Sequence, residues 1–233
     1  NLAPVGTGSF RFKEMNEDRL ILERNPSDYR AQPYLDRLQF IFYPDEHAAL
    51  AAYRAGEVDG VSRVLLDDLP KVLQDTSLTL HSAPLAGYTA VFLDTQSPLF
   101  ADQVVRQALL YATDRQQLIA QVLQGQGLVA HSPIPPYSWA YDADVPHYAY
   151  DPAQAARLLS EQGWLEQEDA TARTKGSQKL AFTLLTDDNP SHVKVAQELV
   201  RQWSAVGIIA EVEAMPAATL IRDHLRPRQF DAV

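Results

Sequence analysis

The chain has 233 residues, of which 46% are hydrophobic, and this is enough to bury a substantial core in one or two domains. Its net charge of −10 opposes the neutralisation of phosphates, so we expect no nucleic-acid partner. Cysteine is absent, which excludes disulfides and thiolate zinc sites, and no apolar run approaches the roughly 20 residues that span a bilayer. The first residues carry no export signal, so we expect any such signal to lie outside this sequence.

The first predicted element is a hairpin. Weak alternation predicts strands at Ser9–Lys13 and Leu20–Arg24, and the polar residues 16–18 between them predict a turn. Asn25-Pro26 and Gln32-Pro33 then interrupt regular structure, because the residue before a proline is displaced from the α region. We therefore expect a hairpin followed by a loop.

A strand, a helix and a second strand are predicted next. Leu38–Tyr43 is apolar enough for a buried strand, and Asp45 can cap a helix that ends near Gly56 in a left-handed turn. Val58–Val61 is expected to be the following strand. This order is typical of a crossover unit in a parallel or mixed sheet.

The stretch from Tyr88 to Ile119 predicts an apolar strand, a short turn and two capped helices. Asp102 is a natural cap for the first helix, and Asp114 is expected to begin the second, which Gly125 ends. The first helix presents one apolar stripe at helical spacing. Its members are Val104, Val105, Ala108, Leu109 and Ala112.

Two later helices each start at an acid or amide followed by proline. Asp151-Pro152 predicts a helix that ends at Gly163, and Asn189-Pro190 predicts one that ends at Gly207. Strands are expected at Leu180–Leu185 and Ile208–Val212, on either side of the second helix. This second crossover unit predicts an α/β lobe over about residues 94–233.

No catalytic motif is evident. The six histidines lack metal-site spacing, and Gly6–Ser9 lacks both the lysine of a phosphate loop and the pattern of a nucleophile elbow. Asp67-Asp68 and Asp187-Asp188 precede predicted helices, so we expect them to cap backbone amides. A role as the paired acids of a hydrolase is the remote alternative. We thus expect no catalytic residue, no bound metal and no cofactor.

An aromatic, proline-rich loop is the clearest functional signal in the residues themselves. Ser132–Tyr141 combines a stiff proline backbone with large amphipathic rings, among them Tyr137 and Trp139. Such a loop suits the wall of a ligand cleft. A loop that only covers the core of its lobe is an equal alternative.

Four segments resemble, in the same order, the extracellular solute-binding proteins of family 5, the peptide and nickel class. They are PVGTGSFRF at Pro4–Phe12, NPSDYRAQPYLD at Asn25–Asp36, GEVDGV at Gly56–Val61, and the stretch from Tyr88 to Ile119. The resemblance implies an α/β, two-lobed periplasmic-binding-protein-like fold with a large second lobe and an incomplete first lobe. It assigns residues 1–87 to lobe I, 88–93 to a crossover strand or hinge, and 94–233 to lobe II.

The resemblance also implies ligand-binding residues. Family members direct side chains of the crossover strand into the cleft, and His192 matches a position that contacts ligand in oligopeptide binders. With Tyr137 and Trp139 of the aromatic loop added, the candidates are Tyr88, Phe92, Asp94, Tyr137, Trp139 and His192. Phe92 replaces an acid of some oligopeptide binders, and Ala217 or Ala218 replaces a tryptophan, which argues against a peptide. The family's Gly-Trp-x-x-Asp segment would follow Val233, so we expect this chain alone to bind ligand weakly or not at all.

The function implied by the resemblance is that of the substrate-binding component of an ABC importer. It would capture a small, peptide-like solute between two lobes and deliver it to the permease subunits, without enzymatic chemistry. We expect it outside the cytoplasm, either periplasmic or anchored on the outer face of the membrane, and in contact with the membrane only through an anchor or the permease. The alternative is a ligand-sensing domain of the same fold fused to a transcriptional regulator.

Overall fold

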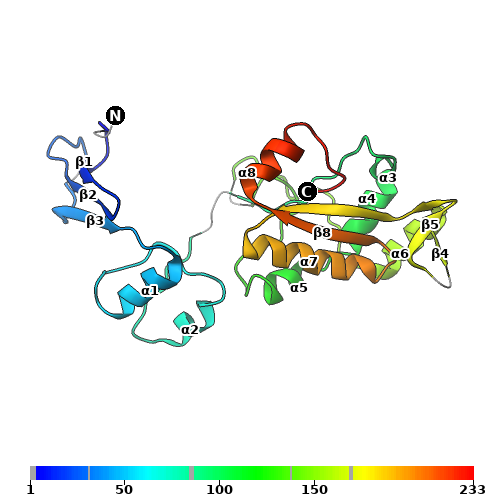
Figure 1. Ribbon diagram of the computed structural model, residues 1–233, viewed down its shortest axis with the longest axis horizontal. Helices are drawn as coiled ribbons and strands as arrows, with labels where there is room; N and C mark the ends of the chain where they lie inside the picture. Colours follow the sequence, from blue (N-terminus) through cyan, green and yellow to red (C-terminus); the bar gives the residue numbers. More distant parts are fainter. Residues whose placement is uncertain (1–3, 31, 84–86, 137, 168–169) are drawn as a thin grey trace. The chain divides into compact units, whose positions relative to one another are not determined.

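The computed structural model describes residues 4–30, 32–83, 87–136, 138–167 and 170–233 (Figure 1). Its chain divides into two compact units, Asn1–His81 and Ser82–Val233. Among the described residues, no helix combines the length and the apolar character that crossing a membrane requires. The assignment of 88–93 as a hinge between lobes stays a prediction.

The first unit contains a three-stranded antiparallel sheet in the order β1-β2-β3. The predicted hairpin is confirmed, because β1 pairs with β2 and the side chain of Asn16 accepts hydrogen bonds from the amides of Asp18 and Arg19 in the turn. Leu22 sits between Phe12 and Leu38 across the three strands. The strands are β1 (Phe10–Met15), β2 (Arg19–Arg24) and β3 (Arg37–Ile41).

The crossover predicted in this unit is wrong. Residues 58–61 form no strand, and β3 pairs antiparallel with β2. Asp59 and Gly60 make this segment a poor strand former, and the adjacent hairpin supplies β3 with a partner without any crossover. β3 is also less buried than expected, since Phe40 is 48% exposed.

Two short helices complete the first unit. In α1 (Glu46–Arg54) the carboxylate of Asp45 accepts from the amide of Ala48 at 2.8 Å, and Gly56 has the left-handed φ of 74°, so this helix is confirmed at both ends. In α2 (Leu69–Gln74) the expected cap is wrong, because the side chain of Asp68 accepts no hydrogen bond from the helix. Its carboxylate pairs instead with the ring of His47 at 2.6 Å.

The second unit is built on a parallel pair of strands with a helix between them in sequence. β7 (Ala181–Asp187) pairs in register with β8 (Ile209–Met215), and α7 (Pro190–Ser204) lies along them (Figure 1). Asn189 caps α7 through the amide of Ser191, and Gly207 ends the turn that follows with φ 79°. The predicted crossover is therefore confirmed here.

Four shorter helices pack on this framework, and three of them begin at the predicted aspartates. Asp102, Asp114 and Asp151 each accept from an amide of the first helical turn, at 2.8 to 2.9 Å. The capped helices are α4 (Gln103–Tyr111), α5 (Arg115–Gln121) and α6 (Pro152–Glu161), and α3 (Pro98–Ala101) precedes them.

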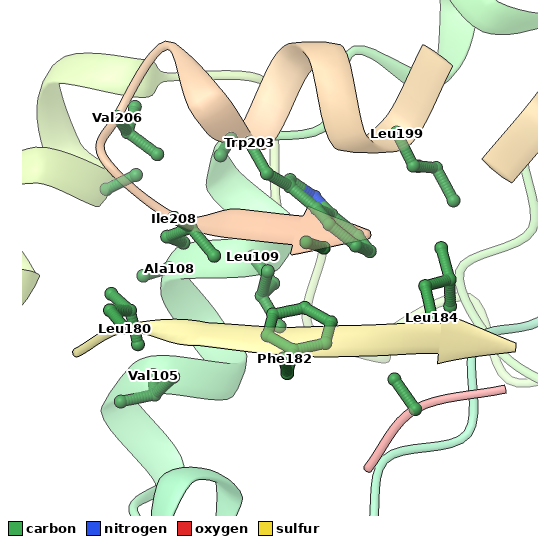
Figure 2. Close-up of a cluster of buried hydrophobic side chains, with 14 of the residues drawn as sticks. Val105, Ala108, Leu109, Leu180, Phe182, Leu184, Leu199, Trp203, Val206 and Ile208 are labelled. Carbon is green, nitrogen blue, oxygen red and sulfur yellow. The ribbon is translucent and has the colours of Figure 1, made fainter. Parts of the chain in front are cut away.

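The main core lies between β7, β8, α4 and α7 (Figure 2). Phe182 meets the ring of Phe100 edge-on at 4.9 Å, and the indole of Trp203 donates to the hydroxyl of Thr113 at 2.9 Å. A second, smaller cluster contains Leu185, Met215 and Leu220. The buried side chains labelled in Figure 2 are Val105, Ala108, Leu109, Leu180, Phe182, Leu184, Leu199, Trp203, Val206 and Ile208.

A small sheet in the second unit, and the arginine that holds it, were not predicted from the sequence. β4 (Leu165–Gln167), β5 (Ala170–Lys175) and β6 (Gln178–Lys179) form an antiparallel sheet between α6 and β7. Arg173 of β5 is 3% exposed and donates to the carbonyls of Val206 and Trp164 and to the hydroxyl of Ser160. Beyond β8 the chain forms α8 (Ala217–Thr219) and the π-helical segment η1 (Leu220–Leu225).

Candidate functional site

The crossover segment joins the sheet of the second unit through residues that follow much later in the chain. Phe92 and Val233 exchange two backbone hydrogen bonds of 2.7 and 2.9 Å, and the amide of Asp94 donates to the carbonyl of Asp231 at 2.8 Å. On their other side residues 231–233 bond to β7, since the amide of Leu185 donates to the carbonyl of Ala232 at 2.9 Å. Residues 231–233 therefore lie between residues 92–94 and β7.

The direction of these strands places Phe92 at the carboxyl end of β7. Residues 231–233 run parallel to β7, and residues 92–94 run antiparallel to both. Phe92, opposite Val233, therefore lies toward the end at which Asp187 finishes β7, and Asp94, opposite Asp231, lies toward the other end. Ligands of open α/β sheets bind beyond the carboxyl ends of the strands. We call this end of the sheet, with the start of α7, the carboxyl edge.

Alternation along the crossover segment exposes one aromatic ring. Val91 and Leu93 pack against the main core, whereas Phe92 between them is 60% exposed. Directly opposed residues of an antiparallel pair share a face, so Phe92 lies on the face of Val233, which packs on the smaller cluster. Tyr88, earlier in the same segment, is 55% exposed. Exposed aromatic rings next to a sheet edge are suited to contact a ligand.

A histidine and an aspartate meet where β7 passes into α7. The Nδ1 atom of His192 lies 2.8 Å from the carboxylate of Asp187, which also accepts from the amide of Asn189 at 3.2 Å. Because a carboxylate accepts, the pair fixes Nδ1 as the donor and leaves Nε2 for another partner. The side chain of His192 is 45% exposed, so this second nitrogen belongs to an accessible ring.

The carboxyl edge gathers some of the six predicted residues and not others. Phe92 lies toward the carboxyl end of β7, and His192 meets Asp187, the last residue of that strand. Asp94 instead accepts from the amide of Gln96 at 3.0 Å, in the turn before α3. Trp139 is 98% exposed on the loop between α5 and α6, and Tyr137 lies outside the described residues.

Two features of this edge were missed in the sequence. The apolar run in residues 231–233 is too short to predict a strand, and the pairing of these residues depends on contacts with residues distant in sequence. Asp187 was expected only to cap a helix, although its spacing of five residues to His192 across a helix start could have indicated the pair. Asp187 is thus engaged by His192 and by the amide of Asn189, while Asp188 is exposed. Across the described residues, no group of three or more acidic or histidine side chains could hold a metal ion.

The fold is that of two-lobed periplasmic binding proteins. The chain resembles the solved structure of NikA from Brucella suis in complex with Fe(III)-EDTA with a TM-score of 0.82 at 25% identity, covering 99% of this chain and 47% of that one. The model of the bacterial extracellular solute-binding proteins, family 5 Middle, matches residues 1–233, and the chain belongs to this family. The expected fold class and family are thereby confirmed.

Curated relatives include peptide-binding proteins. The oligopeptide-binding protein AppA of Bacillus subtilis is 32% identical over 235 residues, which are 99% of this chain and 43% of that protein. The dipeptide-binding protein of Escherichia coli is 30% identical over 213 residues, which are 91% of this chain and 38% of that protein. The chain therefore spans less than half the length of these relatives, in agreement with the expectation that it holds only part of the first lobe.

Proposed function

We propose that the protein is the substrate-binding component of an ABC importer, which captures a small solute and delivers it to the permease without changing it chemically. Family membership supports this role, together with relatives that are named for binding oligopeptides and dipeptides. It implies a location outside the cytoplasm, and contact with the membrane only through an anchor or the permease.

The observation that carries the proposal is the composition of the carboxyl edge. An exposed aromatic ring, Phe92, and a histidine with its orientation fixed by Asp187 lie at the end of the sheet where ligands of such folds bind. Neither residue is needed for the core, since both are substantially exposed. The edge offers a stacking surface and one hydrogen-bonding nitrogen, which suits a peptide-like solute with both apolar and polar groups.

The test uses the full-length protein and the ligand that it retains on purification, identified by native mass spectrometry. We expect Phe92→Ala and His192→Ala each to weaken binding of that ligand about 5- to 30-fold in calorimetry, because each removes a contact worth about 1 to 2 kcal/mol. Leu165→Ala is the matched control. Leu165 is 54% exposed on β4, which precedes the amino end of β7, and its loss should leave affinity unchanged.

Two results would count against the proposal. Unchanged affinity in both edge variants would show that the ligand is held elsewhere. Conversion of the ligand to a product during the titration would show that the protein is an enzyme.

A further inference from the structure

Two histidine rings stack on each other at the two ends of the loop between α5 and α6. The rings of His131 and His147 lie 3.7 Å apart between centroids, with an interplanar angle of 17°. His131 is half-buried, and its Nδ1 atom is inaccessible to solvent and has no hydrogen-bond partner. A buried polar atom without a partner is uncommon in a folded protein, so the position calls for a physical explanation.

One arginine holds the same two loop ends. The guanidinium of Arg115, near the start of α5, donates to the carbonyl of Ala130 at 2.8 Å and to that of Tyr148 at 2.7 Å. These carbonyls belong to the residues directly adjacent to the stacked histidines. The ring of Tyr148 in turn meets the ring of Tyr111 on α4 at 5.3 Å, so the loop ends are fastened to two helices.

The surroundings of the stack contain positive charge, and no described carboxylate is found paired with either ring. Among the described residues, the ion pairs of histidine are those of His47 and His192, so neither stacked ring has a carboxylate partner. The charged group that faces the stack is Arg115, and the loop's own acids, Asp142 and Asp144, are exposed. A proton on either ring would therefore add charge beside an existing cation in a partly desolvated position.

We propose that the His131–His147 stack is an acid-sensitive latch, which holds both ends of the α5–α6 loop at neutral pH and releases them as the pH falls below about 6.5. When both rings are neutral they can stack face to face next to the guanidinium. When His131 takes up a proton, its ring and Arg115 repel each other, and the contacts at the loop ends weaken together.

The direction of the pH dependence follows from proton linkage. Burial, followed by the charges of His147 and Arg115, lowers the pKa of His131 in the closed loop. In the open loop the ring is solvated and its pKa returns to the ordinary value. Over the interval between the two values the open form binds more protons, so opening becomes more favourable as the pH falls, by up to about tenfold per pH unit for one proton. Above the ordinary value both forms are neutral, and opening does not depend on this ring.

Cleavage of the loop by thermolysin under native conditions measures its opening. The rate of cleavage between residues 128 and 150 is compared at pH 7.5, 6.5 and 5.5, and is divided at each pH by the rate for a free peptide of the same residues. We expect the normalised rate of the wild type to rise severalfold to tenfold between pH 6.5 and pH 5.5. We expect it to vary less than twofold in the double variant His131→Phe/His147→Phe, which keeps two stacked rings and cannot take up protons.

A remote histidine provides the matched control. His81→Gln changes an exposed histidine of the first unit, and this variant should follow the wild type. A flat wild-type profile, or a rise of equal steepness in the double variant, would overturn the latch. If the double variant does not fold, His131→Phe alone replaces it, and there too a rise as steep as that of the wild type overturns the proposal.

A histidine ring titration by NMR is the independent measurement. The resonance of His131 should titrate below the ordinary histidine pKa of about 6.5. A midpoint at or above that ordinary value would also overturn the proposal.

Discussion

Replacing Arg173 with methionine should destabilise the second unit strongly, without removing apolar volume. The arginine donates to the carbonyls of Val206 and Trp164 at 2.7 and 3.0 Å and to the hydroxyl of Ser160 at 2.9 Å. Hydrogen bonds from a charged donor contribute about 1.5 to 3 kcal/mol each, which for these three bonds sums to roughly 4.5 to 9 kcal/mol. Burying the guanidinium costs several kcal/mol, so we expect a net loss of about 3 to 5 kcal/mol in the free energy of unfolding.

Urea unfolding followed by tryptophan fluorescence measures this loss. Trp164 and Trp203 are 3% and 2% exposed in the affected unit, so their emission reports its unfolding. Arg157→Met is the matched control, because the side chain of Arg157 is 65% exposed and its ion pair should contribute less than about 1 kcal/mol.

The carbonyl bonds and the ion pair of Arg173 can be separated. Glu166, which also pairs with Arg173, has a side chain that is 75% exposed, so Glu166→Gln should cost less than about 1 kcal/mol. A loss in Arg173→Met no larger than that in Arg157→Met would refute the reasoning. A loss in Glu166→Gln equal to that in Arg173→Met would assign the stabilisation to the ion pair instead.

Three further predictions concern single positions of the second unit. Gly207→Ala should lower the free energy of unfolding by about 2 to 3 kcal/mol, because its φ is 79° and an added Cβ atom would lie 2.7 Å from the side chain of Arg173. Gly176→Ala is the control, since its φ is 62° and an added Cβ atom would meet open space, and it should lose only about 1 kcal/mol. Equal losses of the two variants in urea unfolding would contradict this prediction. Trp203→Phe should lower the free energy of unfolding by about 2 kcal/mol, because it removes the hydrogen bond from the indole to Thr113 and leaves a gap in the core. A decrease of less than about 0.5 kcal/mol in calorimetry would contradict this prediction. A hydrogen bond from Arg201 is the chief cause that lowers the pKa of Glu198. The stabilisation by Glu198 is therefore complete above the ordinary pKa of a glutamate and is lost as the pH falls through the lowered pKa. Glu198→Gln should make the free energy of unfolding fall less steeply with decreasing pH on the acid side, and an unchanged slope in urea unfolding would exclude this role.

Helix starts were predictable because their signals are local. At Asp102, Asp114 and Asp151 the cap and the amide that it accepts from lie two or three residues apart, so the sequence contains the whole interaction. The crossover of the second unit was predictable for a related reason, since its apolar strands and long amphipathic helix leave few alternatives. Asp68 shows the limit of the rule, because His47 competes for its carboxylate.

Features that depend on distant partners were not predictable. The β4–β6 sheet owes its position to Arg173, whose guanidinium reaches the carbonyl of Val206, 33 residues away. A charged residue in a short polar segment gives no sign that it will be buried, and the segment lacks the apolar alternation that marks a strand. Val58–Val61 is the opposite case, in which a weak apolar pattern finds no partner strand among the described residues.

The candidate site was predictable in part. Family resemblance led to Phe92 and His192, and the exposure of Phe92 agrees with simple alternation between Val91 and Leu93. The sequence could not show that Asp94 faces the other end of the sheet, because that depends on its register with Asp231. Ligand contact by the six predicted residues, and any role of the α5–α6 loop in it, stays a prediction.

The insertion of residues 231–233 between residues 92–94 and β7 has a consequence for biosynthesis. Residues 92–94 and β7 both leave the ribosome before residues 231–233. More than a hundred residues separate residues 92–94 from residues 231–233, and their synthesis takes on the order of ten seconds at cellular elongation rates. Until the central segment arrives, each neighbour presents an unpaired strand edge, and one of them carries the exposed ring of Phe92. The nascent chain therefore passes through a period in which the central position of its sheet is unfilled.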